Sequence, residues 1–174
     1  MSFDQFNTAR LLVQNWRPTV DEREARQTLE EDLSAILSHC VLEHLPEPLQ
    51  VDHQSGGVSA WIDARAEESE VLLVKFKHSK ELVGLMVLAS DPGVAKKQPL
   101  HLGYLLAEAV WGQGIASELL NGFVSAVKND GPTRLVGGVG KGNPASARVL
   151  QKAGFVLAPH MSTSQTDMFV YDVK

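Results

Sequence analysis

Residues 100–117 read LHLGYLLAEAVWGQGIAS, an apolar run followed by a glycine-rich turn. The run predicts a strand, and the small residues Gly112, Gly114 and Ala116 predict a tight turn into a helix. Such a turn leaves several backbone N–H groups free, and the helix N-terminus adds the positive end of its dipole. The stretch therefore predicts an anion site built from main-chain amides, suited to a phosphorylated ligand. A tight helix start without a ligand is the alternative interpretation of the turn alone.

Two common phosphate-binding patterns do not fit these residues. Ser117 stands where G-x-G-x-x-G needs its third glycine, and the turn lies well past mid-chain without a βαβ start before it, so a dinucleotide-binding fold is not indicated. A second glycine-rich stretch, residues 137–142, lacks the G-K-[ST] ending of a P-loop.

The remaining sequence predicts the elements around this turn. Apolar residues recur every fourth position from Ile115 and predict a helix over 115–128. Thr19 and Glu22 have capping-box spacing, so we expect a helix there that Pro46 ends. The other expected elements are a helix from after Gly56-Gly57 towards Glu68, a polar loop over 91–98, a helix over 144–153, and strands over 8–14, 71–77, 82–88, 134–139, 155–157 and 168–172. Their order predicts one mixed α/β domain over residues 1–174, with an antiparallel half and a parallel junction.

Charge and composition narrow the class of protein. The chain has 174 residues and a net charge of −5, whereas a general nucleic-acid binder needs a basic surface. Cys40 is the only cysteine and the histidines show no paired spacing, so we expect neither a disulfide nor a metal. No apolar run reaches the ~18 residues that span a membrane, and the first residues lack a signal-peptide pattern. We therefore expect a cytoplasmic protein without nucleic-acid or membrane partners.

A second motif follows the strand over 134–139. Residues 143–155 read NPASARVLQKAGF, with Asn143, Ser146 and Gly154-Phe155 at characteristic positions. Together with Trp111-Gly112-Gln113-Gly114-Ile115-Ala116, this segment resembles the GNAT family of acyl-CoA-dependent N-acetyltransferases, and most closely its RimJ/RimL-like group. The resemblance implies an α/β (α+β) fold, with a mixed, mostly antiparallel sheet of about seven strands flanked by about four helices.

The resemblance also assigns residues to acetyl-CoA, the expected co-substrate. Tyr104, Leu105 and Leu106 would line a splayed strand whose backbone pairs with the pantetheine arm. Asn143 would bind near the thiol end, or it merely caps the following helix. The residues implied for the pyrophosphate are Gly112, Gln113, Gly114, Ile115, Ala116 and Ser117.

The chemistry, attack of an amine on a thioester, needs a base and a proton for the leaving thiolate. His101 occupies the strand position where many family members place a carboxylate base, and Glu108 is the other candidate. Many relatives use a Tyr seven residues after the Asn as acid, but here that position is Leu150. Ser146 is the acid that the resemblance leaves. Each of these three polar residues has an alternative as an ordinary structural group.

We expect an N-acetyltransferase that acts on a peptide or protein N-terminal α-amine, by direct attack in a ternary complex. Acetylation of a small amine, such as an antibiotic or polyamine, is the alternative within enzymes. A non-catalytic acyl-CoA-binding regulatory module is the alternative outside them. The acceptor site is expected among the first two helices, the hairpin over 71–88 and the loop over 159–167, in a monomer or homodimer.

Overall fold

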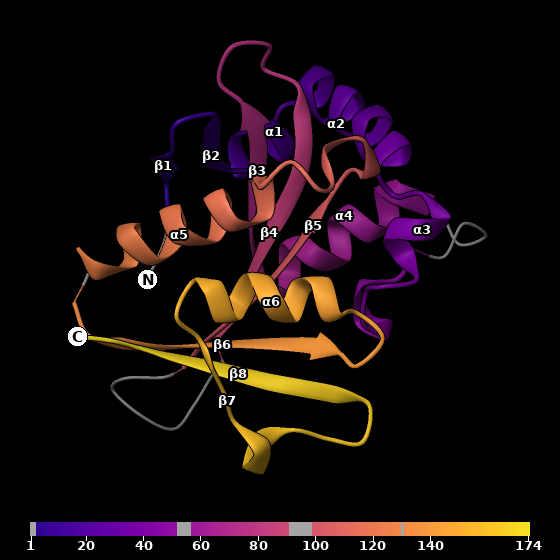
Figure 1. Cartoon of the computed structure of the whole chain (residues 1–174). Helices are drawn as coiled ribbons and strands as arrows, with labels where there is room; N and C mark the ends of the chain where they lie inside the picture. The colour runs from indigo at the N-terminus through magenta and orange to yellow at the C-terminus, as the bar shows by residue number, and fades with distance from the viewer. Residues whose placement is uncertain (1–2, 52–56, 91–98, 130) are drawn as a thin grey trace.

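The computed structural model describes residues 3–51, 57–90, 99–129 and 131–174 (Figure 1). Its α-helices are α1 (Arg17–Asp21), α2 (Arg23–Ile36), α3 (His39–Leu42), α4 (Gly57–Glu68), α5 (Ile115–Lys128) and α6 (Pro144–Lys152). Three short 3-10 helices are η1 (Glu47–Leu49), η2 (Glu108–Val110) and η3 (Pro159–Met161). The strands are β1 (Gln5–Asn7), β2 (Leu11–Asn15), β3 (Glu70–Phe76), β4 (Leu82–Ser90), β5 (Leu100–Leu106), β6 (Thr133–Gly140), β7 (Val156–Leu157) and β8 (Thr166–Val173).

The strands of the described residues form one eight-stranded sheet in the order β1-β2-β3-β4-β5-β6-β8-β7. Every neighbouring pair is antiparallel except β5 and β6, which run parallel and are joined through α5. A parallel pair needs a long crossover, and a helix of 14 residues provides it. The mixed, mostly antiparallel sheet that we expected is confirmed.

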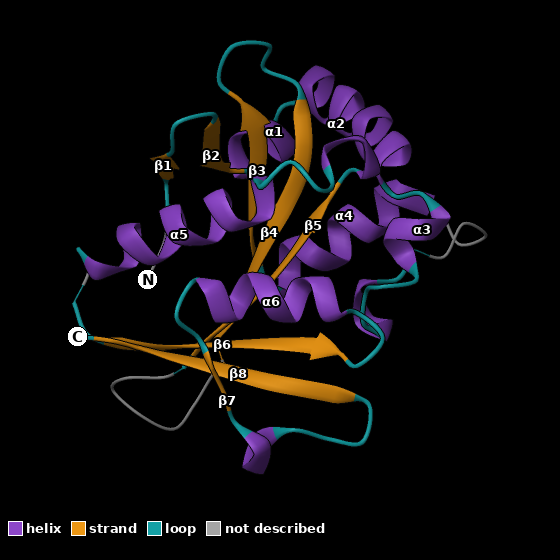
Figure 2. Cartoon of the chain, in the orientation of Figure 1, coloured by secondary structure: helices purple, strands orange, loops and turns teal. Residues whose placement is uncertain are grey.

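Helices cover both faces of the sheet (Figure 2). On one face Leu102 and Leu106 of β5 share a core with Phe123 of α5. On the other face Leu105 belongs to a second core, with Leu33 of α2 and Ile62 of α4. Neighbouring strand residues point to opposite faces, so a β5 residue's position in the sequence decides which layer it contacts.

Several expected elements agree closely with the structure, and others are wrong in their details. β5 and α5 have the expected bounds, and α4 begins at Gly57, while Gly56 and the loop 91–98 lie outside the described residues. The expected strand over 8–14 is instead a hairpin of β1 and β2.

The capping box expected at Thr19 is wrong. Thr19 lies inside the short α1, and Glu22 is the residue that caps α2, accepting hydrogen bonds from the N–H groups of Glu24 and Ala25. The helix expected to reach Pro46 ends at Ile36, because Leu37 leaves the helical conformation and Ser38 caps a new helix, α3.

None of the helices among the described residues is both long enough and apolar enough to cross a bilayer.

Candidate active site

The glycine-rich turn leads from η2 into α5 with two residues in the left-handed region. Gly112 has φ 73° and Gly114, the N-cap of α5, has φ 76°. A Cβ on Gly112 would meet nothing within 4 Å, so the backbone conformation and not crowding calls for glycine there. Ile115 is buried and anchors the helix start, whereas the turn from Trp111 to Gly114 is exposed. The first amides of α5 are thus presented on an open surface, as an anion site requires.

Two side chains attach this turn to the residues before it, one to the end of β5 and the other to η2. Trp111 donates from its Nε1 to the carbonyl of Leu106 at 2.8 Å. Gln113 donates from its Nε2 to the carbonyl of Ala109 at 2.7 Å. These contacts place the turn directly beyond the last residues of β5.

β5 and β6 separate before β5 ends. Their pairing consists of Leu100↔Leu135, His101↔Val136 and Leu102↔Gly137, whereas β5 stays paired with β4 as far as Leu106. Because Ala107 N–H donates to Val83 C=O, alternation directs the backbone groups of Leu105 towards β4 and those of Tyr104 and Leu106 towards β6. The separated strand therefore presents main-chain groups to an opening in the sheet, where amides of a pantetheine arm can pair.

Two side chains meet on the α6 side of this opening. The Tyr104 hydroxyl lies 3.0 Å from Ser146 Oγ, and Asn143 Oδ1 accepts a hydrogen bond from Ser146 N–H at 3.1 Å. Burial raises the pKa of Tyr104, and the Ser146 hydrogen bond only partly offsets this, so the phenol stays protonated. Asn143 does cap α6, but the cap uses Oδ1 and leaves the Nδ2 amide compatible with a ligand.

Leu150, at the position of the missing tyrosine, is a core residue. It is buried, and a Cβ on Gly137 of β6 would lie 3.3 Å from its methyl groups. The phenol near the opening comes from Tyr104 on β5 instead. The sequence does not predict the Tyr104–Ser146 contact, because it joins residues 42 apart in the chain.

His101 lies in the part of β5 that is still paired with β6. By alternation it shares a face with Leu105, the face covered by α2 and α4, whereas Tyr104 and Ser146 lie on the face of α6. The structure therefore does not bring His101 and Ser146 to one side. It places the candidate base in the paired part of β5, before the opening, and on the opposite face of the sheet from the candidate acid.

Glu108, the second base candidate, connects η2 to α3. It accepts hydrogen bonds from Ser38 Oγ, at 2.6 Å, and from the Cys40 thiol. Both bonds lower the pKa of Glu108, with Ser38 the larger cause, and a carboxylate so stabilised is a weaker base. The contact instead holds the start of α3 beside the turn.

A groove of 810 Å³ lies elsewhere, between β1 and α5. Its lining includes Phe6, Glu118 and Gly122 but none of the residues from Gly112 to Ser117. We assign the site to the β5–β6 opening, because the main-chain groups and polar side chains converge there. Among the described residues no cluster of three or more His, Cys, Asp or Glu side chains could hold a metal ion.

Comparisons with known proteins identify the family and the fold. A family model described as an acetyltransferase (GNAT) domain matches residues 10–156. No curated protein matches the sequence.

Solved structures resemble this one over nearly the whole chain. A RimL ribosomal L7/L12 alpha-N-protein acetyltransferase in complex with coenzyme A is 18% identical, with a TM-score of 0.73 and 98% of each chain covered. An acetyltransferase from Salmonella typhimurium, described as modifying the N-terminal serine of ribosomal protein L7/L12, is 16% identical, with a TM-score of 0.70 over 96% of this chain and 97% of that one. A GNAT-family acetyltransferase from Bacillus anthracis is 17% identical, with a TM-score of 0.69 and 97% of each chain covered.

Proposed function

The chain belongs to the GNAT acetyltransferase family, and from that premise we propose that it transfers acetyl from acetyl-CoA to the N-terminal α-amine of a peptide or protein. The observation that carries the proposal is the position of the glycine-rich turn at the end of β5, beside the opening where β5 leaves β6. A diphosphate and a chain of amides require these two features next to each other.

The residues of the turn suit the nucleotide end of acetyl-CoA. The amides from Gly112 to Ser117 face a diphosphate with the dipole of α5 behind them. The backbone groups of Tyr104 and the N–H of Leu106 pair with the pantetheine amides, while the Leu106 carbonyl accepts from Trp111 Nε1. Asn143 Nδ2 donates near the thioester. Because this proposed cradle, the amides from Gly112 to Ser117, is built from main chain, it binds an anion despite the net charge of −5.

The group that accepts the amine proton and the group that protonates the thiolate lie on different faces of the sheet. The amine approaches from the side of α2 and α4, the face of β5 on which His101 lies. His101, placed before the opening, accepts the amine's proton through water as the C–N bond forms. A backbone N–H of β5 stabilises the oxyanion. The thiolate leaves with the C–S electron pair on the α6 side, where Ser146 supplies a proton that solvent replaces. Tyr104, protonated and bonded to Ser146, orients that hydroxyl.

Two observations support a peptide acceptor. Two of the solved structures with this fold are described as acting on ribosomal protein L7/L12. The helices on the amine side carry many carboxylates, among them Asp21, Glu24 and Glu31 of α1 and α2. A negative surface steers cationic amines towards it.

The test measures thiol release from acetyl-CoA with peptides of varied first residue, the same peptides with blocked N-termini, and a panel of polyamines and aminoglycosides. We expect turnover only with free N-termini, and a product heavier by one acetyl group at the first residue. Turnover confined to small amines would replace the peptide acceptor. Acetyl-CoA binding without turnover on any amine would indicate a binding module, a role that Leu150 in place of the usual tyrosine makes chemically reasonable.

A further inference from the structure

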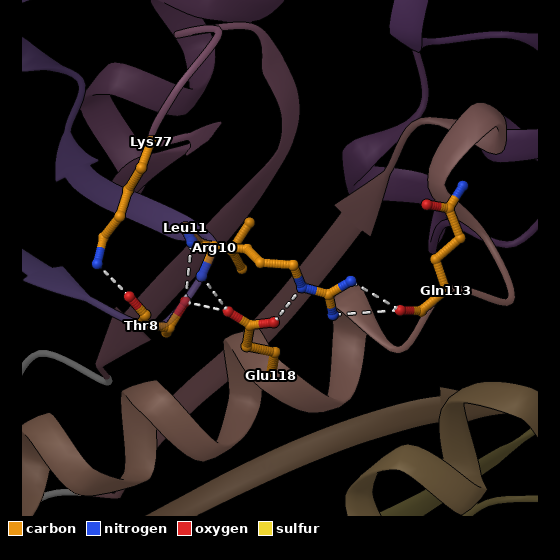
Figure 3. A network of polar contacts seen from close by, with 6 residues as sticks. All are labelled: Thr8, Arg10, Leu11, Lys77, Gln113 and Glu118. Carbon is orange, nitrogen blue, oxygen red and sulfur yellow. Dashed lines mark hydrogen bonds and ion pairs between the residues drawn. The ribbon is translucent and has the colours of Figure 1, made fainter.

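An arginine from the N-terminal hairpin contacts the glycine-rich turn (Figure 3). Arg10 lies between β1 and β2, more than a hundred residues before the turn in the sequence. Its Nη1 and Nη2 donate to the carbonyl of Gln113 at 3.1 and 3.2 Å. No spacing in the sequence indicates this contact, because it depends on how the hairpin packs against α5.

Glu118, in the first turn of α5, holds Arg10 in place. Its Oε2 accepts from Arg10 Nε at 2.6 Å, and its Oε1 accepts from Arg10 N–H at 2.7 Å and from Thr8 Oγ1 at 2.5 Å. The Glu118 side chain is 17% exposed, so it is largely screened from solvent. Burial alone raises the pKa of Glu118, but the hydrogen bonds from Thr8 and Arg10 outweigh it and lower that pKa. Glu118 therefore accepts these bonds as a carboxylate at neutral pH.

The hairpin cannot move away from α5 without losing close packing. A Cβ on Gly122 would lie 2.5 Å from Thr8 Cγ2 and 3.1 Å from the Phe6 ring. Lys77 of the loop after β3 also donates to the Thr8 carbonyl. The packing of the β1–β2 hairpin against α5 thus fixes the position of the Arg10 guanidinium beside the turn.

The contact determines the direction of one peptide plane. In a trans peptide the C=O of one residue and the N–H of the next point in opposite directions. Because Arg10 donates hydrogen bonds to the Gln113 carbonyl, the Gly114 N–H points away from Arg10. We propose that Arg10, held by Glu118, is a positioning residue that orients the Gln113–Gly114 peptide so that its N–H faces the diphosphate of acetyl-CoA. This role rests on the proposed function.

If Arg10 acted by attracting the diphosphate directly, Glu118→Gln would change the binding of coenzyme A in the opposite direction. Glu118 neutralises the arginine and lies in the first turn of α5, close to where an anion would bind. On electrostatic grounds alone, removing its charge with Glu118→Gln strengthens anion binding. If Glu118 instead anchors Arg10, the same substitution loosens the peptide and weakens binding. The sign of the change separates the two roles.

The experiment measures the Kd of coenzyme A and the KM and kcat for acetyl-CoA. For Arg10→Ala we expect Kd and KM to rise about tenfold with kcat unchanged, the size of one hydrogen bond to a charged group. Arg10→Lys should keep the thermal stability but not the affinity, since an ammonium lacks the planar fork that spans Glu118 and Gln113. Glu118→Gln should also weaken binding.

The matched control is Arg134→Ala. Arg134 is a similarly half-exposed arginine, paired with Asp172 at 2.6 Å between β6 and β8. Its loss should leave the Kd unchanged. Tighter binding by Glu118→Gln, or wild-type affinity in Arg10→Ala, would overturn the role of Arg10.

A second readout needs no ligand and separates this inference from the proposed function. In ¹⁵N–¹H spectra of the free chain, Arg10→Ala should shift the Gly114 amide resonance, and Arg134→Ala should not. An unshifted Gly114 resonance would refute the positioning role. A wild-type chain that binds no coenzyme A would instead refute the proposed function.

Discussion

Gly114 takes a backbone conformation that other residues reach only with strain. At φ 76° a Cβ costs about 1–2 kcal/mol, although the nearest atom to such a Cβ is 3.8 Å away. The strain is relieved by moving the peptide on either side, and those peptides supply the amides of the proposed cradle. The residue is thus needed for the direction of its backbone groups.

Gly114→Ala is expected to raise the Kd for coenzyme A about tenfold, because one amide is turned away from the diphosphate. Titration calorimetry measures the effect. Gly131→Ala is the matched control, since Gly131 also has a positive φ, 95°, with open space around it, but lies beyond the other end of α5. Equal affinities in the two variants would mean that the turn does not bind the cofactor.

Tyr104 and Ser146 should act as one unit. Ser146→Ala is expected to lower kcat about tenfold, a modest loss because a thiolate leaves readily. Tyr104→Phe should lower kcat by roughly threefold through the lost orienting bond. The double variant should match Ser146→Ala in steady-state kinetics, because Tyr104 works only through Ser146. Additive losses would show that the two act separately, and Ser125→Ala on α5 serves as the control.

His101 is expected to take part in the proton transfer. His101→Gln should lower kcat about a hundredfold, the low end of what a general base contributes, and leave the Kd for coenzyme A unchanged. His78→Gln, in the turn after β3, is the control and should keep the wild-type kcat. A wild-type kcat in His101→Gln would remove His101 from the mechanism.

At the scale of elements, the end of β5 depends on a close approach by β4. A Cβ on Gly84 would lie 2.3 Å from the Leu105 carbonyl oxygen, and a backbone atom cannot rotate out of the way. Glycine at this position lets β5 remain paired with β4 to Leu106 while it separates from β6.

Gly84→Ala is expected to destabilise the chain by about 1–3 kcal/mol, the usual range for an overfilled core. For a chain of this length that corresponds to a fall in Tm of several degrees, about 2–4 °C per kcal/mol, measurable by calorimetry. Gly103→Ala on the facing strand is the control, because a Cβ there meets nothing within 4 Å. A Gly84→Ala chain as stable as the control would show that the strands can shift freely.

Elements with strong local signals were predictable from the sequence. β5 and α5 were expected with their observed bounds. No proline and no Asp, Glu, Lys or Arg interrupts Leu100–Leu106, and the apolar residues of α5 recur regularly at every fourth position. The break between α2 and α3 was not expected, since the apolar spacing continues across it through Leu37 and Val41 while the backbone turns at Leu37. Local periodicity does not reveal such a break when both helices bury the same side.

At the scale of the whole molecule, Glu118 links the N-terminal hairpin to the turn of the site. Because its folded pKa lies below the ordinary value of 4.5, Glu118 stabilises the fold above that pH, and the contribution is lost as pH falls through the folded pKa. We expect Glu118→Gln to be less stable than wild type at neutral pH.

The difference between Glu118→Gln and wild type should shrink as the pH falls below about 4.5. Urea unfolding across this range measures it. Asp172→Asn should show a smaller difference, because the Asp172–Arg134 pair is exposed to solvent. A gap that persists at low pH would mean that the carboxylate charge is not what stabilises the link.

The site was predictable where it depends on local motifs, and not where distant segments meet. The turn and the cap at Asn143 follow from neighbouring residues. The Arg10–Gln113 contact and the Tyr104–Ser146 pair join residues 103 and 42 positions apart, and only the packed sheet brings them together. Alternation along a strand separates the faces of β5, but only its helical neighbours show that His101 and Ser146 lie on opposite sides.

The most direct test is a crystal structure of the chain with acetyl-CoA. We expect the diphosphate against the amides of Gly112 to Ser117, with the pantetheine beside Tyr104 and Leu106 and the thioester close to Ser146. Nucleotide density in any other place, or a pantetheine that lies outside the β5–β6 opening, would contradict it.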